Sequence, residues 1–172
     1  MKSIIITFVL IVAAFSVQAQ GTVDRTNFRA GINAGIVTGD ASDFYSFSLG
    51  LDILHVWGLS REIDLGIATG FNNAFGEEET FSDAGITIST DFANVQYIPA
   101  AVALRIYPSY GFKFGGDIGY AIGVSDGFDG GLYYKPLIGL DINGSTELNV
   151  SYAAISGNGT FSTAMIGVLF LF

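Results

Sequence analysis

The side chains in this sequence that could do chemistry are charges set at alternating positions within apolar stretches. Between residues 112 and 122, for example, Lys113 and Asp117 share one side of a period-two pattern whose other side is large and apolar. The same parity places four bases and five acids on one face of the expected strands. These nine residues are Arg29, Arg105, Lys113, Lys135, Asp52, Asp64, Asp117, Asp141 and Glu147. Buried charges are tolerated only when they are paired, so we expect ion pairs among them.

Nucleophilic catalysis finds little support in the sequence. A nucleophile needs a base beside it, and His55 is the single histidine. The alternation puts His55 on the apolar face with Leu51 and Ile53, near Trp57, which suits an interfacial side chain better than a catalytic base. The chain has no cysteine, which excludes disulfides and Cys-ligated metal sites. We therefore predict no enzyme activity and no cofactor, and keep a lipid-modifying enzyme as an alternative.

The composition points to a membrane protein. Half of the 172 residues are hydrophobic and only 13% are charged, against about a quarter in ordinary soluble domains. The 15 Phe and 8 Tyr residues rule out a disordered chain. With 16 acidic residues against 7 basic ones, the chain lacks the clustered cations that nucleic-acid binding requires.

The N-terminus has the pattern of a secretory signal. A basic start is followed by an almost unbroken apolar run over Ile4–Val17, and the small Ala19 suits the last position before a signal-peptidase cut. We expect residues 1–19 to be the signal peptide and residues 20–172 to form the mature domain. The alternative, a membrane anchor, is disfavoured because the run is shorter than the ~20 residues that a spanning helix needs.

The mature chain alternates with a period of two in eight segments. It has no second long apolar run, and the remaining way to cross a bilayer is a closed barrel. We predict an all-β fold: an eight-stranded antiparallel up-and-down transmembrane β-barrel, preceded by a cleaved signal peptide. The expected strands include residues 28–38, 45–53, 63–68, 97–106, 112–122, 132–142, 147–152 and 164–172. Residues 72–93 are expected to be irregular, and an even strand number puts both termini on the periplasmic side.

The apolar face of these strands should point outward. A soluble lipid-binding barrel would put that face inside, yet an eight-stranded barrel has room for little more than ordinary side chains. With the apolar face toward lipid, small residues would fill the narrow lumen. Aromatic and histidine side chains near strand ends then suggest interfacial girdles. The girdle candidates are Tyr45, His55, Trp57, Phe112, Tyr134 and Phe161.

Two short turns sharpen the expected ion pairing. A three-residue turn would set Arg105 opposite Lys113. A second turn of the same length would set Asp141 opposite Glu147. Each pair is like-charged and unfavourable alone, but the two pairs lie on neighbouring strands at one level. We therefore predict a belt of two cations and two anions that plugs the lumen, with a gated pore as the alternative.

The remaining acids gather mainly in the expected outer loops, without a base among them. These loop acids are Asp40, Asp43, Glu77, Glu78, Glu79, Asp83, Asp91, Asp126 and Asp129. A solvated, repulsive surface is the simpler interpretation, and divalent-cation binding is the alternative. No stretch has the Asp-x-Asp-x-Asp-Gly spacing of a calcium loop, so we predict no metal site.

Three segments carry a resemblance to a known family: FRAGINAGIVTGD at Phe28–Asp40, YIPAAVALRIYPSYGFKFGGDIGYAIG at Tyr97–Gly123 and IGVLFLF at Ile166–Phe172. They resemble the small outer-membrane β-barrels of Gram-negative bacteria, the porin-family domain common in Bacteroidota. The architecture is similar to that of the eight-stranded outer membrane protein A and X barrels. The resemblance implies location in the cell outer membrane. It also implies a terminal strand whose Phe170 and Phe172 are read by the outer-membrane assembly machinery.

These expectations describe a monomeric protein whose partners are outer-membrane lipid and the assembly machinery, and not nucleic acid. A structural or envelope-maintaining role, with surface loops for interaction, suits a closed lumen best. A narrow porin for small solutes is the first alternative, ahead of a lipid-modifying enzyme and a soluble lipid-binding barrel.

Overall fold

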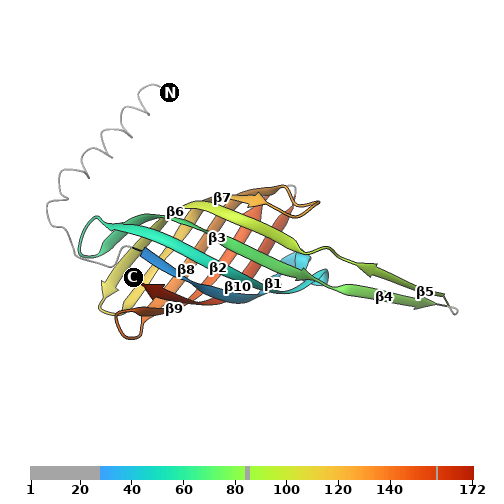
Figure 1. Cartoon of the computed structure of the whole chain (residues 1–172), viewed down its shortest axis with the longest axis horizontal. Coiled ribbons are helices and arrows are strands. Elements are labelled where there is room, and N and C mark those ends of the chain that lie inside the picture. Colours follow the sequence, from blue (N-terminus) through green and yellow to red (C-terminus); the bar gives the residue numbers. More distant parts are fainter. Residues whose placement is uncertain (1–27, 84–85, 158) are drawn as a thin grey trace, which may run out of the picture.

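The chain folds into a closed antiparallel β-barrel (Figure 1). The computed structural model describes residues 28–83, 86–157 and 159–172. The barrel strands are β1 (Phe28–Thr38), β2 (Tyr45–Gly58), β3 (Ile63–Gly76), β6 (Val95–Ser109), β7 (Phe112–Gly123), β8 (Gly130–Asp141), β9 (Thr146–Ser156) and β10 (Thr160–Leu171). The predicted eight-stranded antiparallel barrel is confirmed, whereas the expected signal peptide lies outside the described residues.

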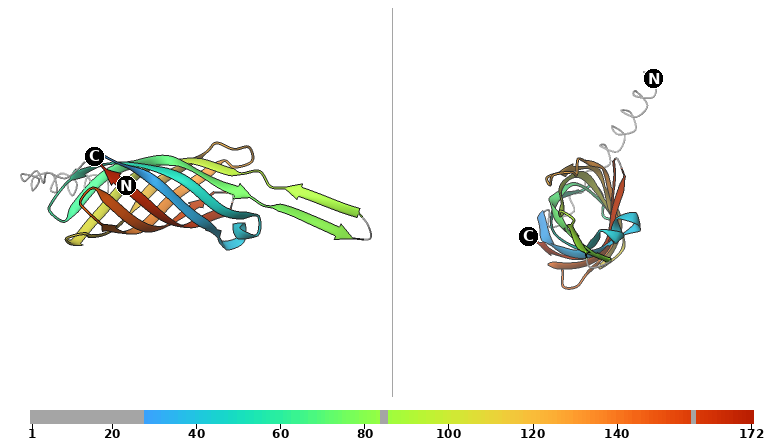
Figure 2. Two further views of the ribbon diagram at one scale, coloured as in Figure 1. Left: turned by 60° about the horizontal axis from the view of Figure 1, so that its bottom comes forward. Right: turned by 90° about the vertical axis from the view of Figure 1, so that its right-hand side faces the viewer.

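The barrel closes by pairing its first strand with its last. The β1–β10 ladder runs from Arg29↔Leu171 to Thr38↔Ser162, and a view along the long axis shows the complete ring (Figure 2). The backbone N–H of Phe172 donates to the carbonyl of Phe28 at 2.9 Å. We call the end of the barrel that holds this contact the terminal end, and the opposite one the hairpin end.

Side chains alternate between the outside of the barrel and its lumen, because successive residues of a strand point to opposite faces. In β1, Ile32 and Ile36 are 59% and 62% exposed, whereas Asn33 and Val37 between and beside them are buried. The other barrel strands follow the same rule, with large apolar residues outside. The predicted outward orientation of the apolar face is confirmed.

The hairpin end carries a two-stranded extension that the sequence did not indicate. Strands β4 (Glu78–Asp83) and β5 (Ile86–Asp91) pair with each other in register from Glu78↔Asp91 to Asp83↔Ile86. They project beyond the barrel rim (Figure 2). The prediction that residues 72–93 are irregular is therefore wrong. The alternating Ile and Thr residues of this segment favour strands, but its acidic residues and glycine masked that signal.

The other connections are short. A 3-10 helix, η1 (Gly39–Asp43), joins β1 to β2 at the hairpin end, and a tight turn at Tyr110 and Gly111 joins β6 to β7 at the terminal end. Gly111 has a φ of 80°, a conformation that favours glycine. Among the helices in the described part of the chain, none is long and apolar enough to span a membrane.

Candidate functional site

The lumen is the candidate functional site, and the structure places all nine alternating charges there. Seven of them are buried, and Asp52 and Asp141 are partly exposed. Every one of the nine takes part in an ion pair. The charges divide into one group at the terminal end and two separate pairs nearer the middle of the barrel.

The group at the terminal end, which we call the terminal cluster, is a continuous chain of ion pairs. Lys113 Nζ lies 2.6 Å from Glu147 Oε2 and 3.0 Å from Asp141 Oδ1. Arg29 continues the chain, with Nη1 3.7 Å from Glu147 Oε2 and Nη2 3.3 Å from Asp64 Oδ2. Because these residues come from β1, β3, β7, β8 and β9, the cluster crosses the lumen from wall to wall.

Tyr107 completes the terminal cluster and was missed by the sequence analysis. Its hydroxyl donates to Asp64 Oδ2 at 2.7 Å and accepts from Arg29 Nη2 at 2.8 Å. Lys113 Nζ also lies 5.5 Å from the centre of the Tyr107 ring. The signal was present, because Tyr107 has the same parity in β6 as Arg105. The sequence pattern predicts the end of this strand at residue 106, so Tyr107 is not among the predicted lumen residues.

Two further pairs lie nearer the centre of the barrel. Arg105 Nη1 lies 2.7 Å from Asp117 Oδ1 and also donates to the carbonyl oxygen of Gly116. Lys135 Nζ lies 2.8 Å from Asp52 Oδ2, and the Asn33 amide donates to the same carboxylate at 3.0 Å. These are charge-assisted contacts with short distances, the strong class of hydrogen bond.

The predicted four-residue belt needs a correction, because Arg105 does not belong to it. Arg105 pairs across the ladder with Gly115 and not with Lys113. The turn was expected to be three residues long, but β6 continues to Ser109 and the ladder has a bulge between Ile106 and Ser109. The second expected pairing, Asp141 opposite Glu147, is present in the β8–β9 ladder.

The hairpin half of the lumen is filled by aromatic and aliphatic side chains. Tyr97, Tyr133 and Phe161 are buried there, with Tyr45 and Phe128 packed against them. The expectation that small residues fill the whole lumen is therefore wrong. So is the assignment of Tyr45 and Phe161 to an outer girdle, because the parity of β10 turns Phe161 inward, where its ring meets Tyr45 at 5.8 Å.

The other girdle and assembly candidates lie on the outside or at the terminal end. The rings of His55 and Trp57 are 4.7 Å apart and nearly perpendicular, on the outer face near the terminal end of β2. Tyr134 is outward in the middle of β8, and Phe112 begins β7 at the terminal end. The assembly candidates Phe170 and Phe172 are both exposed.

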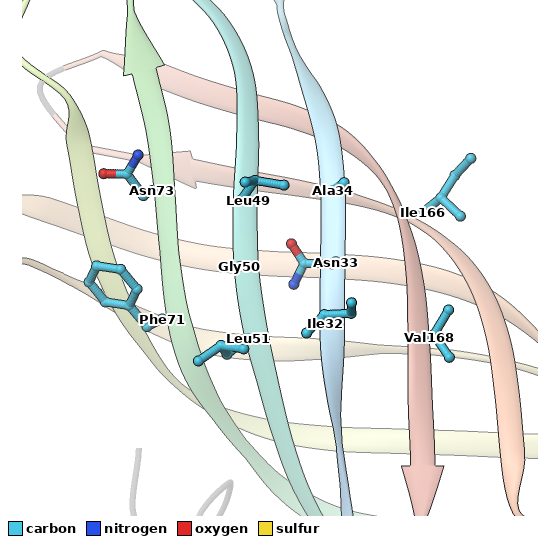
Figure 3. Close-up of a pocket in the computed structure, with 10 residues that line it drawn as sticks. All are labelled: Ile32, Asn33, Ala34, Leu49, Gly50, Leu51, Phe71, Asn73, Ile166 and Val168. Carbon is cyan, nitrogen blue, oxygen red and sulfur yellow. The ribbon is translucent and has the colours of Figure 1, made fainter.

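Three cavities of the barrel lie in the lumen, at the terminal end and on the outer surface. A cavity of about 20 Å³ lies within the lumen, bordered by both central ion pairs. A vestibule of about 650 Å³ opens at the terminal end, and Arg29 and Tyr107 form part of its lining. A third hollow, of about 540 Å³, lies on the outer surface over β1, β2, β3 and β10 (Figure 3). Its lining is largely apolar, with Leu49, Leu51 and Phe71 around Gly50.

Comparison with solved structures gives the same fold. Ail, the attachment invasion locus protein of Yersinia pestis, matches with a TM-score of 0.53 and 14% identity, over 85% of this chain and 97% of Ail. Ail in complex with the heparin analogue sucrose octasulfate matches over the same shares, with a TM-score of 0.51. A de novo designed transmembrane β-barrel matches with a TM-score of 0.51 and 10% identity, over 87% of this chain and 98% of the design.

The fold and the apolar outer surface define this chain as an integral membrane β-barrel protein. It is of the small, eight-stranded type. No protein-family model and no curated protein matches the sequence, and the Bacteroidota type stays a prediction. The described residues contain no group of His, Cys, Asp and Glu side chains that could hold a metal ion.

Proposed function

We propose that this protein is a monomeric, envelope-maintaining barrel whose lumen is closed to ions by its own side chains. The observation that carries the proposal is the terminal cluster. Arg29, Lys113 and Glu147 are fully or almost fully buried and joined by ion pairs across the lumen. An ion that entered from the vestibule would have to separate these charges, which costs several kcal/mol for a buried pair.

A second obstacle supports the closed lumen. Tyr97, Tyr133 and Phe161 pack together on the hairpin side of the central ion pairs. None of these three side chains is more than 7% exposed. Between the two obstacles, the cavity of about 20 Å³ has room for about one water molecule. An eight-stranded barrel of this kind leaves no aqueous channel.

Single-channel recording in planar bilayers tests the closed lumen. We expect the mature protein to show no reproducible conductance. A combined variant, Arg29→Ser with Glu147→Ser, Tyr97→Ala and Phe161→Ala, removes the centre of the terminal cluster and two of the three buried rings, and it should conduct if it migrates on unheated gels as a folded barrel. One reproducible ion-conducting state of the unchanged protein would contradict the proposal and favour the narrow porin.

We also propose that the barrel is not an enzyme. His55 lies on the outer face against Trp57, a position that suits an interfacial side chain. Mass spectrometry of phospholipid and lipid A, incubated with folded or with heat-denatured protein, should give the same lipid species. New acyl products that appear only with folded protein, and that are lost in His55→Ala, would favour the lipid-modifying enzyme.

We propose that the hairpin end faces the cell exterior and that both termini are periplasmic. The longest connection, β4–β5, lies at the hairpin end and short turns lie at the terminal end, which is the usual asymmetry of outer-membrane barrels. The sucrose octasulfate complex of Ail does not suggest the same ligand here. Of the bases in the described residues, Arg29, Arg61 and Lys113 lie toward the terminal end, and Arg105 and Lys135 are paired inside the lumen.

A further inference from the structure

A pocket at the hairpin end is lined by three aromatic rings. It has a volume of about 240 Å³ and lies among the connections β7–β8 and β9–β10 and the start of β2. Tyr45, Phe128 and Phe161 supply the rings, and Asp129 supplies a carboxylate on the rim. This pocket lies at the outer edge of the aromatic filling of the lumen, and Phe161 belongs to both.

The rings meet edge to face and so present differently oriented walls. Phe161 lies 5.8 Å from Tyr45 at an interplanar angle of 82°, and 5.9 Å from Phe128 at 67°. Phe128 also lies 6.3 Å from Tyr97 in the lumen beneath. The face of an aromatic ring carries negative charge density, which attracts an organic cation placed within about 6 Å.

The loop that holds Phe128 is fixed by its backbone. The Phe128 N–H donates to the carbonyl of Ser125 at 3.3 Å, and the Val124 N–H donates to the carbonyl of Gln96 at 2.9 Å. Gly127 and Gly130 have φ values of 82° and 84°, which residues with a Cβ rarely adopt. These hydrogen bonds and turns place Phe128 over the pocket.

The charge around the pocket has one sign. Asp129 on the rim, Asp126 in the same loop, and Asp40 and Asp43 on η1 are all exposed at the hairpin end. The bases of the described residues are either at the terminal end or paired inside the lumen. The field at the pocket therefore favours a cation and disfavours an anion.

From the rings, the rim carboxylate and this charge distribution, we propose that the pocket binds a small organic cation, such as a quaternary or primary ammonium group. An inorganic divalent ion would need several oxygen ligands around it, whereas Asp129 is the one carboxylate residue among the described residues that line the pocket. An ammonium group is instead bound by aromatic rings and a nearby acid, and the pocket is lined by three rings and the carboxylate of Asp129.

Choline binding to the mature protein in nanodiscs, followed by NMR, tests the proposal. The matched control ligand is 3,3-dimethyl-1-butanol, which has the same shape without the charge. We expect choline to bind at least tenfold more tightly than this alcohol. Phe128→Leu should weaken choline binding severalfold, and Phe128→Tyr should retain it because the ring is kept. Asp129→Asn should weaken choline binding and leave binding of the alcohol unchanged.

The exposed turn residue Tyr110 gives the control variant, because Tyr110→Leu lies at the opposite end of the barrel. It should bind choline like the unchanged protein. Equal binding of choline and the alcohol would show an apolar pocket only and overturn the proposal. So would tighter binding of a neutral methyl glycoside, no choline binding by protein that migrates as a folded barrel, or equal loss in Phe128→Leu and Tyr110→Leu.

Discussion

Lys113 and Glu147 lie 2.6 Å apart, from Nζ to Oε2, although β8 separates their strands β7 and β9. Their side chains meet over Gly139 of β8. A Cβ at Gly139 would lie 2.8 Å from Glu147 Oε1 and 3.0 Å from Lys113 Cγ. The absence of a side chain at Gly139 therefore allows an ion pair between β7 and β9, two strands that are not neighbours in the barrel.

Gly139→Ala should destabilise the barrel by about 1–3 kcal/mol, the usual cost of overpacking a filled interior. The added methyl would push the Glu147 carboxylate away from Lys113, and both partners are buried. Urea unfolding in lipid vesicles gives the free energy of unfolding. Gly159→Ala, whose Cβ would meet no described atom within 4 Å, serves as the control. Equal stability of the two variants would contradict this role of Gly139.

Lys113→Met should cost more stability than Glu147→Gln. The terminal cluster contains two cations and three carboxylates. Losing Lys113 leaves one cation with three carboxylates, and uncompensated buried charge costs about 3–5 kcal/mol. Losing the charge of Glu147 leaves two of each sign, so we expect a cost of about 1–2 kcal/mol, as for weakened hydrogen bonds. The same unfolding measurement applies, and the reverse order would show that the cluster is not governed by charge balance.

Trp57 is the single tryptophan, so its fluorescence reports one depth in the bilayer. Its side chain is about half exposed on the outer face, near the terminal end of β2, where interfacial aromatic residues are expected. Lipids that carry a nitroxide near the head group should quench it more than lipids with the nitroxide near the end of the acyl chain. Stronger quenching from the bilayer centre would place Trp57 outside a girdle.

The orientation of the barrel can be read from epitope tags. A tag between Asp83 and Ile86 extends the β4–β5 hairpin, and a tag between Asn143 and Gly144 lies in a turn at the terminal end. Antibody should label intact cells that carry the first tag. It should label cells with the second tag only after the outer membrane is permeabilised. Labelling in the opposite order would reverse the proposed orientation.

Phe172→Ala should lower the amount of protein in the outer membrane severalfold while changing the stability of the refolded barrel little. Phe172 is 71% exposed, and the centre of its ring lies 6.1 Å from that of Phe28. The substitution therefore removes few stabilising contacts. Tyr110→Ala, at another exposed position of the terminal end, is the control. Unchanged membrane levels for Phe172→Ala would remove the proposed role in assembly.

The alternation of apolar and polar residues was enough to predict the barrel and the inward charges. A shift of one residue in the register of a strand would turn its apolar side chains into the lumen, so the pattern determines which side chains point inward. Strand ends were less well determined. The three-residue turn assumed after β6 misplaced Arg105 against Lys113, because the bulge before Ser109 changes the register without leaving a mark in the hydrophobic pattern. The partners of an inward charge depend on that register and on the tilt of the strands.

The aromatic filling of the lumen shows a different limit. Phe161 and Tyr45 were assigned to the outside because aromatic residues near strand ends are typical of girdles. The parity of β10 already placed Phe161 inward. For Tyr45 the alternation also predicted the outer face, and the register shift between Tyr45 and Ser48 in the β2–β3 ladder explains the difference. The β4–β5 hairpin was missed for a third reason. It lies beyond the barrel rim, and its acidic residues and glycine make the sequence look like that of a loop.

The two ion pairs of Arg29 have a consequence for the assembly of the barrel. It belongs to the first strand, yet its partners lie on β3 and β9, on either side of the β1–β10 seam. An open sheet cannot satisfy both contacts. A barrel sealed one residue out of step would turn Arg29 out of the lumen and break both of its buried ion pairs, and breaking a buried pair costs about 3–5 kcal/mol. The same ion pairs that fill the lumen therefore select one correctly sealed ring from all the slipped ones.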